Sequence, residues 1–312
     1  FSGGAVQVTL SKAGITSTGV VKRVIYSSTS KVGSSLLNQA VPASGPVNQG
    51  FYTVALASKS QTPSMDTSTY PQGDGYHTIT LSNLGVINLS GVLADGSTFT
   101  ASSELVAGNI SPVFAQLVTP GAASTSKGGS FSGTLAFDAS QFNTDVSGAD
   151  MLWTRPAVTQ VAGTTIAAKA TQLYTSGWPT GIRVDAVGAL YNKTTSVQNS
   201  LGLATVSSGT KNASLDFTSN EITGSPLTVD AITILGNVVT KVPATNASFT
   251  LTATASTGFF NGTFTPGWGG TKPAYKGIMI QKGTNKGGYG FFISNKFGEL
   301  DPESGRVSLG AP

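Results

Sequence analysis

Short stretches that alternate apolar and polar residues fill most of this sequence. Val6, Val8 and Leu10 alternate with polar residues in "VQVTL", and Ile79 and Leu81 do so in "HTITL". Because successive side chains of a β-strand point to opposite faces of a sheet, this period predicts strands with one buried face. No window of a dozen residues has a convincing helical stripe, and the best helical candidate is the short segment 34–41.

Glycine recurs between these strands in one plan. A small polar turn ends in glycine, an apolar residue follows, and a second glycine stands near the start of the next strand. The first glycine suits a turn position with φ > 0, and the second is typical of a bulge or a close backbone approach. The segments with this plan are 11–20, 82–92, 129–135 and 256–264.

Many short strands joined by glycine turns predict an all-β chain of antiparallel sandwich or barrel units. A stretch rich in proline and small residues, 154–165, interrupts the pattern. We therefore expect two β units, one over residues 1–158 and one over residues 159–312. Residues 42–50 and 60–75 are expected to form exposed loops.

The chain carries little charge for its length of 312 residues. Charged residues make up 10% of it, against roughly 25% in a typical soluble domain. Low charge removes the repulsion that keeps proteins apart, so the composition favours a homo-oligomer or polymer. There is no cysteine, and no apolar run is long enough to predict a membrane span. A chain that begins at Phe1 is expected to be processed or part of something longer.

The net charge of +4 comes with no nucleic-acid-binding motif, and we expect no nucleic-acid partner. Basic residues gather only toward the C-terminal end, which favours a mild attraction to anionic polysaccharide or lipid head groups. These residues are Lys272, Lys276, Lys282, Lys286, Lys296 and Arg306.

The stretch "GIMIQKGTNKGGYGFFIS" combines glycine, lysine and threonine as phosphate-binding loops do. A Walker-type loop needs Lys-Ser or Lys-Thr after its second glycine, and a helix must follow. Here "YGFFIS" follows, which predicts a strand. We expect a hairpin with strands at 275–281 and 288–294.

These strands resemble the C-terminal signature of large, mostly uncharacterised secreted β-rich proteins of verrucomicrobial and planctomycetal bacteria. Segments 73–99, 133–138 and 152–156 are similar to earlier strands of that family. The resemblance implies a β-rich fold and an extracellular or cell-surface setting, and it carries over no catalytic residue. The matching positions in the C-terminal part are Gly277, Gln281, Lys282, Tyr289, Gly290, Phe291, Phe292, Ser304, Gly305, Val307 and Leu309.

Few residues predict chemistry. His77 is the single histidine, and it shares a strand face with Ile79 and Leu81, which favours a structural role over a catalytic one. No nucleophile elbow accompanies it. Aspartates in a turn-rich stretch suggest a Ca²⁺ site as one alternative to simple turn capping. The candidate ligands are Asp138, Asp145 and Asp150.

Aromatic residues beside glycine and proline suggest exposed loops that stack on sugars. The candidates are Trp178, Trp268 and Tyr174, whereas Trp153 is expected in a core. They support a carbohydrate-binding module, with a surface polysaccharide as partner, as one interpretation.

The leading interpretation is a non-enzymatic extracellular structural protein, such as a filament or surface-layer subunit or an adhesive module. A secreted hydrolase ranks third. The stretch with Val6, Val8 and Leu10 lacks charge and proline, so it is a candidate strand for pairing with a neighbouring copy. Pairing within its own chain is the equal alternative.

Overall fold

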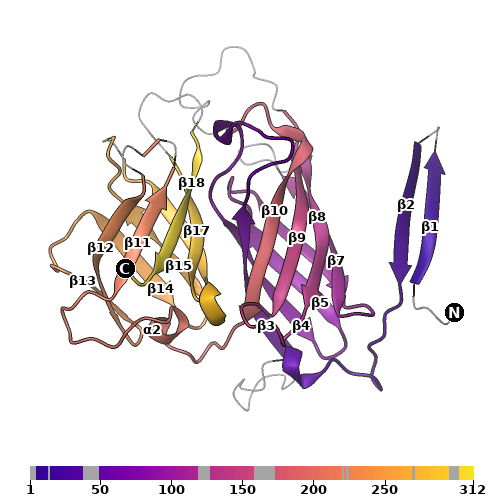
Figure 1. Ribbon diagram of the computed structural model, residues 1–312, viewed down its shortest axis with the longest axis horizontal. Helices are drawn as coiled ribbons and strands as arrows, with labels where there is room; N and C mark the ends of the chain where they lie inside the picture. The colour runs from indigo at the N-terminus through magenta and orange to yellow at the C-terminus, as the bar shows by residue number, and fades with distance from the viewer. Residues whose placement is uncertain are drawn as a thin grey trace.

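The computed structural model describes residues 5–12, 15–37, 49–118, 127–157, 173–219, 221–222, 225–268, 271–294 and 302–312. Nearly all of its regular structure is antiparallel β-sheet, in two eight-stranded sheets and one two-stranded sheet. Each eight-stranded sheet curls into a nearly closed barrel, and the two barrels lie side by side (Figure 1). The predicted all-β class, with two antiparallel β units, is confirmed.

The first barrel has the strand order β6-β5-β4-β3-β10-β9-β8-β7. The end strands β6 and β7 come close to each other, and Ser103 donates a hydrogen bond to the carbonyl of Pro112 across this seam. The strands are β3 (Gln49–Ser58), β4 (Gly75–Ser82), β5 (Val86–Val92), β6 (Thr98–Glu104), β7 (Ile110–Val118), β8 (Lys127–Phe137), β9 (Val146–Arg155) and β10 (Trp178–Leu190).

The second barrel has the order β13-β12-β11-β18-β17-β16-β15-β14. Short helical turns lie in the connections: η1 (Ser34–Leu36), η2 (Thr67–Thr69), α2 (Val197–Ser200) and η3 (Gly283–Asn285). The strands are β11 (Ala213–Thr218), β12 (Leu227–Leu235), β13 (Val238–Lys241), β14 (Phe249–Thr254), β15 (Phe259–Phe264), β16 (Ala274–Ile280), β17 (Gly287–Ile293) and β18 (Ser304–Gly310).

Each barrel encloses its own apolar core. In the first, the rings of Phe99 and Phe131 lie 5.1 Å apart, among inward-facing leucine, isoleucine and valine side chains. In the second, Phe217 stacks on Phe264 at 3.9 Å, and Phe292 meets Phe264 edge to face. Burying these side chains is the main favourable contribution to folding.

The outer faces of some strands are buried as well, because the barrels pack against each other. Ala55 of β3 contacts Ile280 of β16, and Val92 of β5 contacts Phe291 of β17. The buried hydroxyl of Thr53 donates to the carbonyl of Met279 at 2.7 Å. The junction is therefore a packed apolar seam with hydrogen bonds across it.

The boundary between the sheets differs from the predicted one. Strand β10 comes after residue 159, yet it pairs with β3 and β9 of the first barrel. The first barrel therefore extends to Leu190, and the proline- and glycine-rich stretch marks a long connection between β9 and β10. Chain composition shows where strands stop, but not which strands then pair.

The predicted hairpin at 275–281 and 288–294 is confirmed as β16 and β17, joined by η3. The expected loop at 60–75 contains η2 and no strand before Gly75. Residues 42–48 of the other expected loop lie outside the described residues. Of the helical candidate 34–41, η1 covers 34–36, and residues 38–41 are not described.

The glycine plan is confirmed in two copies and wrong in a third, while Gly14 of the copy 11–20 lies outside the described residues. In 256–264, Gly258 sits in a turn with φ of 78°, and a Cβ on Gly262 would collide with the carbonyl oxygen of Thr250 in the neighbouring strand. Gly85 sits in a turn with φ of 84°, and a Cβ on Gly91 would come 2.5 Å from the carbonyl oxygen of Tyr76.

By contrast, Gly129 and Gly133 both lie inside the continuous strand β8, so no turn ends at Gly129. There β8 carries one extra residue against β7, where the register shifts between the pairs Gln116 with Ser130 and Val118 with Lys127.

Candidate functional site

A two-stranded hairpin stands apart from both barrels (Figure 1). Its strands are β1 (Ala5–Lys12) and β2 (Ile15–Lys22), and they pair antiparallel from Ala5 with Lys22 to Lys12 with Ile15. Just after β2 the chain joins the first barrel. Val24 bridges to Val106, and the amide of Ala107 donates to the carbonyl of Arg23. The hairpin is thus anchored at its base only.

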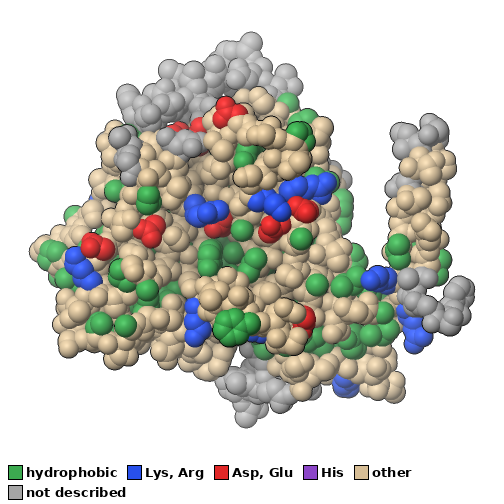
Figure 2. All heavy atoms as spheres, in the orientation of Figure 1, with side chains coloured by type: hydrophobic (Ala, Val, Ile, Leu, Met, Phe, Trp, Pro, Cys, Tyr) green, Lys and Arg blue, Asp and Glu red, His purple; other side chains and the backbone are tan. Residues whose placement is uncertain are grey.

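The register places most of the hairpin's apolar side chains on one face, although Val20 lies on the other face opposite Gln7. Val6, Val8 and Leu10 share one face with Val21, because residues opposite each other in an antiparallel pair lie on the same side. Leu10 is 69% exposed, Val21 57% and Val6 44%. No second layer covers this face within the described part of the chain, and Figure 2 shows the hairpin standing free of the body. An uncovered amphipathic hairpin of this kind is marginally stable alone in water.

Both outer edges of the hairpin are also open. In the described structure neither β1 nor β2 pairs with a third strand. The edge of β1 has no proline, and its one charge, Lys12, lies at its end. Natural proteins usually guard such an edge with charge, proline or a bulge. The hairpin therefore offers main-chain donors and acceptors together with an apolar face.

A second feature is a row of side chains across the outer face of the second barrel. Cross-strand pairing aligns Asn261, Lys276, Phe291, Arg306 and Thr218 on five adjacent strands. The first barrel covers the middle of the row, where the buried Phe291 meets Val92 and Ala94. Two basic side chains, Lys276 and Arg306, therefore flank the buried ring of Phe291 at the junction of the barrels.

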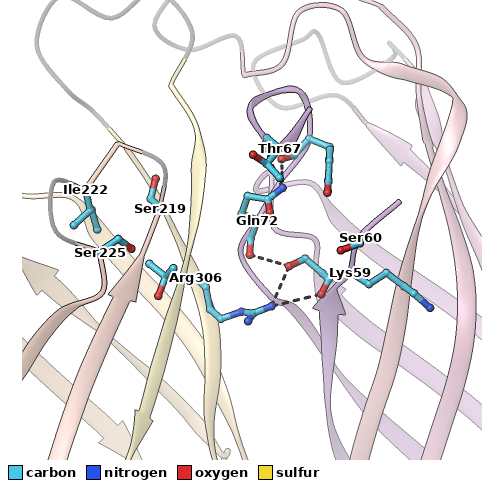
Figure 3. Close-up of a pocket in the computed structure, with 11 residues that line it drawn as sticks. Lys59, Ser60, Thr67, Gln72, Ser219, Ile222, Ser225 and Arg306 are labelled. Carbon is cyan, nitrogen blue, oxygen red and sulfur yellow. Dashed lines mark hydrogen bonds between the residues drawn. The ribbon is translucent and has the colours of Figure 1, made fainter. Parts of the chain in front are cut away.

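On the Arg306 side lies a hollow of about 490 Å³ between the barrels, lined mainly by hydroxyl and amide side chains (Figure 3). The Nε atom of Arg306 lies 3.1 Å from Asp74, and its Nη2 atom donates to the hydroxyl of Ser58 at 3.1 Å. Asp74 is buried, and burial raises its pKa to about 6 although Arg306 and the Ser58 amide lower it. The guanidinium charge is thus already matched by a carboxylate of the other barrel.

The predicted sugar-stacking platform is not present. Trp178 begins β10 and is 2% exposed, Tyr174 is 5% exposed, and their rings lie 5.6 Å apart in the core of the first barrel. Trp153 packs edge to face on Trp178 at 4.9 Å, in the core as predicted. Trp268 is half-buried against the core of the second barrel. The glycine and proline beside Trp178 mark the end of the first barrel. The rings of Trp153, Tyr174 and Trp178 close the core at that end.

The predicted Ca²⁺ ligands do not converge. Asp145 pairs with Lys282 at 2.5 Å, and Asp150 pairs with Lys59 at 2.8 Å. Asp138 accepts hydrogen bonds from Ser140 and Gln141, as a turn-capping aspartate does. Among the described residues, no group of three or more metal-binding side chains comes together.

His77 lies inside the first barrel, 5.9 Å from the ring of Phe99. Burial lowers the pKa of His77 to about 4, although a contact with the Thr78 backbone acts in the opposite direction. The side chain is therefore neutral at ordinary pH, in keeping with the structural role expected for it.

Of the two alternatives for the stretch with Val6, Val8 and Leu10, the structure shows pairing within its own chain, because β1 pairs with β2 along its whole length. The sequence does not predict the pairing of Asp74 with Arg306. The signal for β2 was present, because "ITSTGVVK" follows a glycine turn after β1. No sequence signal links Asp74 with Arg306, since they lie on different barrels. In the described part of the chain, no helix is both long enough and apolar enough to cross a bilayer.

Comparison with family models, with curated proteins and with solved structures found no match to this chain. The resemblance to secreted bacterial β-rich proteins therefore stays a prediction from the sequence motifs.

Proposed function

We propose that this chain is a non-enzymatic extracellular structural protein that assembles with copies of itself through strand edges. The β1–β2 hairpin is the connector, and the paired barrels are the body that it links. The observation that supports this most is the hairpin itself, with its uncovered apolar face and two open edges.

Physical chemistry favours a second copy as the hairpin's partner. Pairing of β1 with a strand of another copy satisfies main-chain groups and brings Val6, Val8 and Leu10 beside further apolar side chains. Three or more strands with a hydrophobic face are stable where two are not. Assembly would therefore stabilise the hairpin as well as join the subunits.

The two open edges of the hairpin belong to different strands, one to β1 and one to β2. This difference affects the form that an assembly of copies can take. If the β1 edge of one copy pairs with the β2 edge of the next, the stack still has one open edge at each end, where a further copy can add. A head-to-tail contact of this kind continues without limit unless its rotation closes a ring. This geometry favours a filament, among the forms that a surface protein takes.

The extracellular setting rests on other support. The sequence motifs resemble those of secreted bacterial β-rich proteins, and the low charge of the chain suits close contact between neighbours. Trp178 and Tyr174 are buried and Trp268 is half-buried in the other barrel, so these residues do not support the carbohydrate-binding interpretation.

Charging the apolar face tests the proposal. We expect the double variant Val8→Lys/Leu10→Lys to remain folded but to lose the large species, because like charges would meet at each contact. Light scattering after size exclusion, over a range of concentrations, measures this. The control is Val238→Lys, which adds a charge at another exposed apolar position, 65% exposed on β13. Unchanged particle size for the double variant, or equal loss in the control, would contradict the proposal.

A further inference from the structure

Lys276 and Arg306 occupy matching places on either side of Phe291, but among the described residues only Arg306 has a carboxylate partner. Arg306 pairs with the buried Asp74. Lys276 is half-buried, and within the described residues it has neither a carboxylate partner nor a hydrogen bond from its ammonium group. The nearest compensation is the ring of Phe291, whose centroid lies 5.2 Å from Nζ. Removing a cation partly from water costs free energy, and a nearby anion offsets that cost.

The surroundings of Lys276 form a groove of about 310 Å³, lined by Pro273, Ala274, Tyr275, Phe291 and Ile293. Lys276 is the one charged side chain among these lining residues. The groove lies where the apolar seam between the barrels reaches the surface, because Phe291 and Ile293 also pack against Val92 and Ala94. Its walls are therefore apolar, and its polar end is a single ammonium group.

We propose that this groove binds a small amphiphilic carboxylate, whose anionic head pairs with Lys276 and whose apolar body packs on Phe291 and Ile293. Charge complementarity selects the head, since an ammonium without a partner binds an anion more strongly where water is partly excluded. The apolar lining selects the body. The groove has the volume of about ten water molecules at about 30 Å³ each, which suits a small ligand of roughly that many non-hydrogen atoms.

The state of Lys276 agrees with this geometry. Burial lowers the pKa of Lys276, because partial removal from water disfavours the charged form. A bound carboxylate favours the charged form and so raises that pKa. Binding of the carboxylate and protonation of Lys276 are therefore linked, so a change in the pKa of Lys276 reports ligand binding.

The test uses the intact protein and octanoate, with octanamide as an uncharged analogue of the same shape and octylamine as a cation. Calorimetry should show saturable octanoate binding, with octanamide and octylamine at least about tenfold weaker, as expected for loss of a charge-assisted contact. Lys276→Met keeps the stem of the side chain and removes the charge, and should weaken octanoate binding by a similar factor. Lys276→Arg should retain most of it.

A matched control and a second measurement complete the test. Lys211→Met removes an exposed lysine of the same barrel and should leave octanoate binding unchanged. In the NMR spectrum of the protein with ¹³C-dimethylated lysines, the signal missing from Lys276→Met should titrate below the other lysines and move up with saturating octanoate. Absence of octanoate binding, equal binding of octanamide, or equal binding by Lys276→Met would each overturn the proposal.

Discussion

His77 shows how a single buried side chain contributes to the pH dependence of stability in this molecule. It lies in the first barrel, fully removed from water, and neither ring nitrogen has a hydrogen-bond partner of normal geometry among the described residues. Only the neutral imidazole is compatible with that site. The folded chain therefore resists protonation that the unfolded chain accepts.

The sign of the effect follows from the pKa of His77, which burial lowers from 6.5 to about 4. Between these values the unfolded chain binds more protons, so the contribution of His77 to stability is complete above pH 6.5 and falls as pH drops toward 4. The total loss is about 3 kcal/mol. We expect His77→Leu to gain stability relative to the original chain as pH falls through this window, measured by urea unfolding.

Asp74 supplies the control with opposite sign. Burial raises its pKa to about 6, so the original chain gains stability from Asp74 as pH falls from 6 toward 4. Asp74→Asn should accordingly lose stability relative to the original chain over the same range. If both differences stay flat with pH, the account of these two buried groups is wrong.

Strand β3 is the element that joins the two barrels. One of its faces lies in the first core through Tyr52, Val54 and Leu56, and the other meets the second barrel through Thr53 and Ala55. Its burial on both faces explains its nearly continuous apolar sequence, "FYTVALA". Thr53 is the polar exception, and its hydroxyl satisfies the carbonyl of Met279.

Thr53→Val tests this junction. The change keeps the shape of the side chain and removes the hydrogen bond, so the buried carbonyl of Met279 loses a partner. We expect the free energy of unfolding to fall by about 1–3 kcal/mol. Thr78→Val on the neighbouring strand β4, where the hydroxyl lies 3.4 Å from the carbonyl of Ser90, should change it by less than about 0.5 kcal/mol. Equal effects of the two substitutions would show that the junction contributes no more than a surface contact.

At this scale the sequence predicts the strands well and their grouping less well. Alternation over 6–10, 77–81 and 248–255 matches β1, β4 and β14, because the period of two is a local property of each strand. The assignment of β10 to the first barrel depends on pairing between segments more than a hundred residues apart. Local composition does not encode that pairing, so the stretch 154–165 has the composition of a boundary between units although the strand that follows it belongs to the first barrel.

The candidate site was predictable to a similar degree. An uncharged alternating stretch is sufficient to suggest an open edge at Val6, Val8 and Leu10. The sugar-stacking prediction failed at Trp178 because glycine and proline also occur where a strand begins at the end of a barrel. There the ring turns inward to close the core. Lys276 was recognised only as one of several basic residues, since its isolation depends on the second barrel's cross-strand register.

The whole molecule combines a packed body of two barrels with an exposed hairpin. The two barrels share a buried seam and ion pairs such as Lys282 with Asp145, so they form one packed unit. The hairpin is held at its base by the contacts of Arg23 and Val24. This division of roles is what a subunit of a polymer needs, with packing energy in the body and unsatisfied strand edges outside it.

The chain contains no cysteine, so single introduced cysteines can map contacts between copies without interference. We expect a Thr9→Cys copy, on β1, mixed with a Thr18→Cys copy, on β2, to form a mixed disulfide-linked dimer under mild oxidation. Paired strands bring such residues within the distance that a disulfide spans. The control is Thr100→Cys, an exposed position on β6. Efficient β1–β2 cross-linking between copies, with none to Thr100→Cys, is the result that the proposed assembly predicts. If the mixture stays monomeric, or links equally to the control position, the hairpin is not the connector.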